Sequence, residues 1–119
     1  MDYTKNKFMF KVQVLESSHS IDIISAKTSK NNAIEHFCNM FADQKEIGNF
    51  LCIGDMGKYP GNDYQLLSNE FSLSVNEVSA DPYTCWNLAS KGVNCVEATL
   101  EYFNAIEFKD NFFKIKFSL

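Results

Sequence analysis

Residues 8–14 read Phe8-Met-Phe-Lys-Val-Gln-Val14, and residues 21–25 read Ile21-Asp-Ile-Ile-Ser25. Apolar and polar side chains alternate in both stretches, which is the period-two pattern of a strand with one face in water. The short polar link from Glu16 to Ser20 favours a β-hairpin, because two such runs joined by a few turn residues pair antiparallel. Residues 8–25 therefore predict an antiparallel hairpin, and this hairpin sets the class of the fold.

Two helices are predicted from apolar spacing and from end signals. The first carries one apolar stripe at helical spacing, formed by Ile34, Phe37, Cys38 and Phe41. We expect Ser29 or Asn32 to cap its first turn, because a short side-chain oxygen accepts from the free N–H groups there. The second is predicted to run from Asp81-Pro82, the favoured order of cap and first helical residue, to Gly92, which suits a left-handed C′ position.

Further strands are predicted in the second half of the chain. The apolar run 49–53 indicates a buried strand, and Phe71-Ser-Leu-Ser-Val75 alternates like a strand with one wet face. Residues 113–119 alternate too, and Asp110-Asn111 offers a turn that pairs them with residues 105–108. Residues 93–104 fit two patterns, so we expect a strand there and keep a helix as the alternative: Val96, Ala98, Leu100 and Tyr102 alternate, while Val96, Leu100 and Phe103 share one helical face.

These elements follow the order ββαββαβββ, with no long polar linker and no repeat. Helices separated by hairpins favour an α+β fold. A length of 119 residues suits one hydrophobic core rather than two. The sequence therefore predicts a single α+β domain over residues 1–119, with a single antiparallel sheet and two helices packed on one of its faces.

Composition narrows the class of partner. Eleven Lys stand against fifteen Asp and Glu, there is no Arg, and the net charge is −4. Nucleic-acid binding is not expected, because such proteins gather cations against phosphates and read bases with Arg. A signal-peptide core and a run approaching about 18 apolar residues are both missing from the sequence, so we expect a cytoplasmic protein with no membrane partner. The Arg-free, Asn-rich composition is typical of an AT-rich genome and would suit a phage, a mobile element or a low-GC bacterium.

Catalytic and metal chemistry find little support in the sequence. The four cysteines, at positions 38, 52, 85 and 95, contain no C-x-x-C pair and are expected to act mainly as small hydrophobic residues. His19 and His36 lie on separate predicted elements, and His36 faces away from Cys38 on its helix. Glu97 and Glu101 are expected to face Lys114 and Lys116 across a sheet rather than to do acid–base work. We therefore predict no catalytic residue, no metal and no cofactor.

The candidate site is the glycine-rich loop from Gly54 to Asp63. Three Gly and one Pro within ten residues argue against a regular element there. Aromatic residues and Met on a loop are typical of protein interfaces, since they bury a large area at low entropy cost. The alternative is that one or two of the rings fold back into the core. The predicted partner-binding residues are Asp55, Met56, Lys58, Tyr59, Asp63 and Tyr64.

The sequence thus predicts a non-enzymatic protein-binding module, an accessory or inhibitor protein that occupies the surface of another protein. A phage-encoded antagonist of a host system is the special case that the composition suits. Two alternatives stay open. One is an enzyme or ligand-binding domain for a small molecule that uses the Gly54–Asp63 loop. The other is a homo-oligomer that associates through the C-terminal edge strand, residues 112–119.

Overall fold

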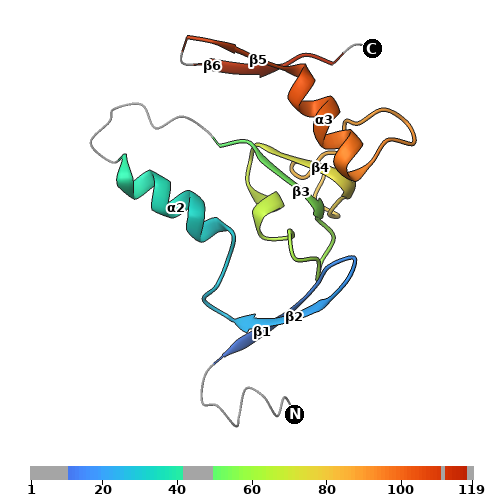
Figure 1. Cartoon of the computed structure of the whole chain (residues 1–119). Helices are drawn as coiled ribbons and strands as arrows, with labels where there is room; N and C mark the ends of the chain where they lie inside the picture. Colours follow the sequence, from blue (N-terminus) through green and yellow to red (C-terminus); the bar gives the residue numbers. More distant parts are fainter. Residues whose placement is uncertain (1–10, 42–49, 111, 118–119) are drawn as a thin grey trace.

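The computed structural model describes residues 11–41, 50–110 and 112–117. They form a mixed α/β fold in which two helices and several short strands succeed one another (Figure 1). This agrees with the α+β expectation in its coarse form. The elements are β1 (Val12–Glu16), β2 (Ile21–Ser25), α2 (Asn31–Met40), β3 (Cys52–Met56), the 3-10 helix η1 (Leu66–Ser68), β4 (Ser72–Glu77), α3 (Cys95–Ala105), β5 (Ile106–Lys109) and β6 (Phe112–Ile115).

The prediction of a single antiparallel sheet is wrong. The described strands form three separate two-stranded sheets, β1–β2, β3–β4 and β5–β6 (Figure 1). The central pair is parallel, with Cys52 opposite Ser72 and Ile53 opposite Leu73. The reason is the connection: residues 57–71, with η1 inside them, form a crossover long enough to return β4 alongside β3 in the same direction. Alternating side chains predict a strand but not its partner or direction.

Both predicted hairpins are confirmed. In the first, Val12 pairs with Ser25 and Glu16 with Ile21. In the second, Ile106 pairs with Ile115, and the turn residue Asp110 has a positive φ of 54°. Some residues that these predictions included lie outside the described part of the chain, namely residues 8–10, Asn111 and residues 118–119.

The first predicted helix is confirmed as α2, but the expectation that Ser29 or Asn32 occupies its N-cap position is wrong. Lys30 occupies the N-cap position without a side-chain cap. Ser29 Oγ instead accepts a hydrogen bond of 3.1 Å from the N–H of Asn31, whereas the Asn32 side chain donates to the carbonyl of Lys27. On the apolar stripe, Ile34 packs against the buried Cys52–Leu67–Cys85 cluster, and Phe37 lies 6.5 Å from Phe50, ring centre to ring centre.

The second predicted helix, from Asp81 to Gly92, is wrong. Cys85 has a positive φ of 58°, which a right-handed helix does not accept. Backbone pairing with β4 prevails instead, because the N–H of Ser74 donates to the carbonyl of Trp86 at 2.8 Å. Asp81 accepts from the N–H of Tyr83 at 2.9 Å, so its capping oxygen closes a turn rather than a helix.

The expected strand over residues 93–104 is also wrong, and the helical alternative is right. This segment forms α3, which packs Ala98 and Tyr102 against β4. Leu73, Val75, Ala98 and Tyr102 make one buried cluster, to which Ile115 of β6 adds. The second cluster, Cys52, Leu67 and Cys85, adjoins the candidate loop, because Gly57 lies close to Cys85 and Leu67. The core is therefore built around the parallel pair β3–β4, with the two hairpins attached at its ends.

Candidate functional site

The Gly54–Asp63 loop is only partly irregular. Gly54, Asp55 and Met56 belong to β3, so the expectation that no regular element occurs there is wrong for these three residues. The rest of the loop turns sharply: the N–H of Gly61 donates to the carbonyl of Lys58 at 2.6 Å, and the N–H of Asp63 to that of Met56 at 3.3 Å. A Cβ at Gly61 would lie 2.2 Å from the Met56 carbonyl oxygen, so the close turn requires glycine at this position.

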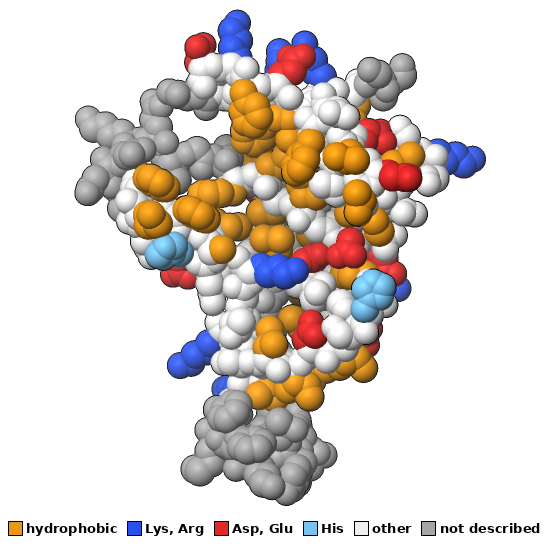
Figure 2. All heavy atoms as spheres, viewed as in Figure 1, with side chains coloured by type: hydrophobic (Ala, Val, Ile, Leu, Met, Phe, Trp, Pro, Cys, Tyr) orange, Lys and Arg blue, Asp and Glu red, His pale blue; other side chains and the backbone are white. Residues whose placement is uncertain are grey.

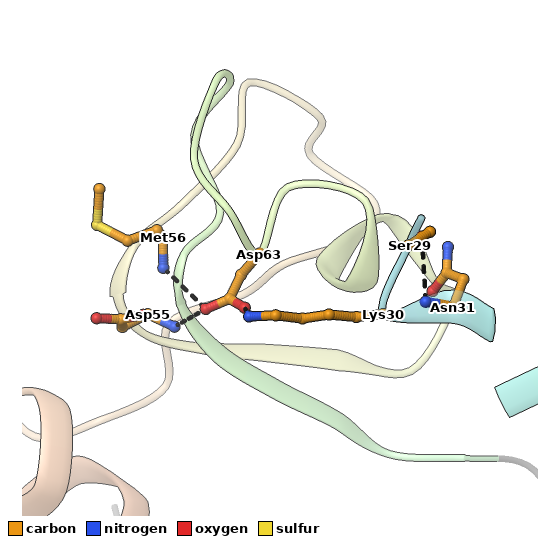
Figure 3. Close-up of polar contacts among 6 residues, drawn as sticks. All are labelled: Ser29, Lys30, Asn31, Asp55, Met56 and Asp63. Atoms are coloured by element: carbon orange, nitrogen blue, oxygen red, sulfur yellow. Dashed lines mark hydrogen bonds and ion pairs between the residues drawn. The ribbon is translucent and has the colours of Figure 1, made fainter. Parts of the chain in front are cut away.

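A buried carboxylate fixes the base of the loop. Asp63 is 4% exposed, and its side chain points back toward β3 and Lys30 (Figure 3). Oδ2 accepts hydrogen bonds from the N–H groups of Asp55 at 2.8 Å and Met56 at 3.3 Å, while Oδ1 forms an ion pair with Lys30 Nζ. A Cβ at Gly54 would meet the carboxyl group at 2.6 Å, so glycine at that position makes room for it.

The charges around this carboxylate shift two pKa values in opposite directions. Burial alone raises the pKa of Asp63, but the hydrogen bonds from Lys30 and from the backbone of Asp55 outweigh it and hold the pKa below its ordinary value. The pKa of Asp55 is raised by burial and by the neighbouring Asp63 carboxylate. Asp63 is therefore ionised in the folded chain and acts as a fixed acceptor for Lys30 and two amides.

The loop is also joined to the first hairpin. The N–H of Glu16, at the end of β1, donates to the carbonyl of Pro60 at 2.9 Å, and the N–H of Asn62 donates back to the carbonyl of Glu16 at 2.8 Å. Further along, Gln65 Nε2 donates to Gln13 Oε1 at 3.1 Å. Main-chain contacts on one side and the Asp63 carboxylate on the other therefore anchor the loop to β1, β3 and Lys30.

Two tyrosines project from this fixed base. Tyr59 is 69% exposed and Tyr64 is 38% exposed, and their rings meet edge to face with centres 5.3 Å apart. We call these two residues the tyrosine pair. The alternative in which the rings fold back into the core does not hold, because both stay at the surface. Lys58 beside them is exposed as well.

The six predicted site residues thus divide into two groups. Tyr59, Tyr64 and Lys58 present their side chains to solvent, whereas Asp63 turns inward and Asp55 and Met56 are half-buried in β3. Lys30, which completes the carboxylate site, was missed by the sequence analysis. It stands 33 positions before Asp63, and no local pattern marks it as a partner.

A second polar site, also missed, lies where α3 meets residues 85–92. The buried Tyr102 donates its hydroxyl to the carbonyl of Ser74 at 2.7 Å and accepts from the N–H of Leu88 at 2.9 Å. Glu101 accepts from the N–H of Ser90 at 3.0 Å. The expectation that Glu97 and Glu101 face Lys114 and Lys116 across a sheet is wrong, because both glutamates lie on α3. Glu107 is next to these lysines instead, 3.1 Å from Lys116 Nζ and 3.9 Å from Lys114 Nζ.

The cysteines serve packing at two positions. Cys52 and Cys85 are buried in one cluster, and burial raises the pKa of both thiols, which keeps them protonated. Cys38 is half-buried and Cys95 exposed. Across the described ranges, side chains of His, Cys, Asp and Glu nowhere gather in threes that could hold a metal ion.

Within the described part of the chain, no helix combines the length and the apolar character that crossing a membrane requires. Comparison of the sequence and the structure with protein-family models, curated proteins and solved structures gave no match.

Proposed function

We propose that this protein is a non-enzymatic protein-binding module, and that the tyrosine pair with Lys58 is its contact surface. The observation that carries the proposal is a pair of exposed, mutually packed aromatic rings on a loop whose backbone is fixed from both sides. Such rings bury a large area on a partner, and a contact surface that is already ordered loses little entropy on binding.

We infer a supporting role for Asp63 from the contacts at the base of the loop. Its carboxylate faces Lys30 and two amides instead of solvent, so it positions the tyrosine pair without touching the partner. Asp55 and Met56 belong to this support as well, because they provide those amides. The partner surface proposed here is therefore smaller than the one expected from the sequence: it comprises Lys58, Tyr59 and Tyr64.

In the test, the full chain and two variants are immobilised, and the amounts of partner protein that they capture are compared. Tyr59→Ala together with Tyr64→Ala removes the tyrosine pair. Tyr83→Ala is the matched control, because Tyr83 is an even more exposed tyrosine on a different turn. The proposal predicts capture by the wild type and the control, and loss by the double variant.

Once a captured partner is purified, its affinity gives the quantitative test. Removal of two central aromatic contacts should weaken binding by about 2 kcal/mol or more, roughly thirtyfold in Kd. Equal affinity of the double variant and the wild type would refute the tyrosine pair as the contact surface. Equal loss in Tyr83→Ala would show that the exposed aromatics act without specificity.

A further inference from the structure

The start of α2 is joined to the chain that leads out of the glycine-rich loop by three side-chain contacts. Lys30 Nζ forms an ion pair with Asp63 Oδ1 (Figure 3). Asn31 Nδ2 donates to the carbonyl of Gln65 at 3.2 Å, and Asn31 Oδ1 accepts from Asn69 Nδ2 at 2.7 Å. The partners stand 33, 34 and 38 positions apart in the sequence. These contacts therefore fix the first turn of the helix against a distant segment.

The Lys30 contact neutralises a charge that is otherwise isolated. Asp63 is 4% exposed, and the second carboxyl group beside it, that of Asp55, adds repulsion. Figure 2 shows basic and acidic side chains spread over this face of the molecule without a large patch of either sign. Among the described residues, Lys30 is the one cation within ion-pair distance of Asp63. The carboxylate therefore depends on this single lysine to stay inside the fold.

Asp63 in turn fixes the backbone next to the tyrosine pair. Its carboxylate accepts from the N–H groups of Asp55 and Met56, and Tyr64 follows it directly in the chain. A carboxylate that lost its cation would turn to water, because a buried unpaired charge is costly. The two amides would then lose their acceptor, and Tyr64 would lose the anchor that holds its ring centre 5.3 Å from that of Tyr59.

We propose that Lys30 is a positioning residue of the tyrosine pair, and that its ion pair with Asp63 couples the start of α2 to the proposed contact surface. Lys30 acts through the carboxylate and contributes no contact to the partner. The importance of this coupling for binding rests on the proposed function, whereas the coupling itself can be measured in the free chain.

Amide hydrogen exchange of the free full chain, followed residue by residue by NMR, tests the coupling. Lys30→Met removes the charge and keeps a side chain of similar length. The N–H groups of Asp55 and Met56 should then exchange about tenfold faster, because they lose hydrogen bonds to a charged acceptor. The Ser74 N–H, which donates to the carbonyl of Trp86 at 2.8 Å, should keep its rate.

Lys27→Met is the matched control, because Lys27 is an exposed lysine just before α2. This variant should leave the exchange of Asp55 and Met56 unchanged. Unchanged exchange in Lys30→Met, or the same acceleration in Lys27→Met, would overturn the proposal. Equal acceleration at Ser74 would show a general loss of stability and would overturn it as well.

Two further variants test whether Lys30 acts through Asp63. Lys30→Arg keeps the cation and should restore slow exchange at both amides. Lys30→Met introduced together with Asp63→Asn should exchange no faster than Asp63→Asn alone, because no carboxylate charge is left to neutralise. Fast exchange in Lys30→Arg, or additive effects in the double variant, would contradict the proposal.

Capture of a partner separates this inference from the proposed function. Immobilised Lys30→Met should capture less partner than the wild type and Lys27→Met. Full capture by Lys30→Met, with loss of capture in the double variant Tyr59→Ala and Tyr64→Ala, would overturn the coupling to binding and leave the tyrosine pair as the contact surface. Wild-type capture by the tyrosine double variant would refute the contact surface instead, and amide exchange alone would then decide whether Lys30 holds the loop.

Discussion

Replacement of Asp63 by Asn removes one buried negative charge and almost nothing of its shape. The carboxylate takes part in an ion pair with Lys30 and accepts from two backbone amides. Hydrogen bonds to a charged group contribute about 1.5–3 kcal/mol and those to a neutral group about 0.5–1.5 kcal/mol. The Asn amide oxygen can still accept from the two N–H groups, but without the charge.

The loss of stability depends on whether the Lys30 ammonium group stays buried after its carboxylate partner is removed. Breaking a buried ion pair costs about 3–5 kcal/mol when the remaining charge stays buried. The Lys30 side chain is 49% exposed, so its ammonium group can turn to water. We therefore expect Asp63→Asn to lower the free energy of unfolding by about 2 kcal/mol at neutral pH. Urea unfolding followed by far-UV circular dichroism measures this value.

The pH dependence gives a second and independent measurement. Because the pKa of Asp63 is held below its ordinary value, the unfolded chain binds a proton at this residue more readily than the folded chain. The stabilisation is complete above the unfolded pKa of about 4 and is lost as the pH falls through the lower folded pKa. The difference between wild type and Asp63→Asn should therefore shrink on acidification.

Asp55→Asn is the matched control, with the same substitution at the neighbouring acidic residue. The pKa of Asp55 is raised by burial and by Asp63, so ionisation of Asp55 at neutral pH opposes folding. We expect this variant to be at least as stable as the wild type at neutral pH. The role assigned to the buried carboxylate would be refuted if Asp63→Asn were as stable as the wild type. It would also be refuted if the loss of stability in Asp63→Asn did not change with pH.

Three further predictions concern packing and thiol chemistry. Gly57→Ala should destabilise the fold by about 3 kcal/mol in urea unfolding, because its Cβ would lie 2.2 Å from Cys85 Sγ. The control Gly92→Ala should cost about 1 kcal/mol, because Gly92 has a φ of +81° but open space around it. Similar losses of stability in the two variants would contradict this prediction. Tyr102→Phe should lower the free energy of unfolding by about 1–3 kcal/mol, because the Leu88 amide and the Ser74 carbonyl lose the hydroxyl group that they bind. An unchanged urea midpoint would show that water takes the place of this hydroxyl. A thiol reagent should modify the exposed Cys95 first and reach Cys52 and Cys85 only on unfolding. Mass spectrometry of the labelled chain measures the order of modification. Early labelling of Cys52 or Cys85 would contradict their burial.

Local sequence patterns were sufficient to predict the elements that form between residues close together in the sequence. The two hairpins close over turns of a few residues, so alternation and turn chemistry together specify them. The helix α2 follows from the spacing of Ile34, Phe37 and Cys38. The exposed tyrosines were also within reach of the sequence, because Gly and Pro around them predict a surface turn.

Elements that depend on distant partners could not be predicted in this way. The segment after Asp81 carries sound helix signals, but pairing of Trp86 with β4 outweighs them. The parallel arrangement of β3 and β4 is a property of the crossover between them, which no strand pattern contains. For the same reason Asp63 could not be assigned to the interior, since the Lys30 that neutralises it comes from the start of a helix far away in sequence.

The strand expected over residues 93–104 is wrong because the apolar residues of α3 lie on two opposite sides of the helix. In a helix that is apolar on one face only, apolar residues recur at three and four positions and cannot alternate for long. They alternate over Val96, Ala98, Leu100 and Tyr102 because successive members of this series fall on opposite sides of α3: Ala98 and Tyr102 inside, Val96 and Leu100 outside. A strand would need one wet face, which the intervening Glu97, Thr99 and Glu101 imitate. The alternation that imitates a strand is therefore the sequence pattern of a helix whose apolar residues are buried on one side and exposed on the other.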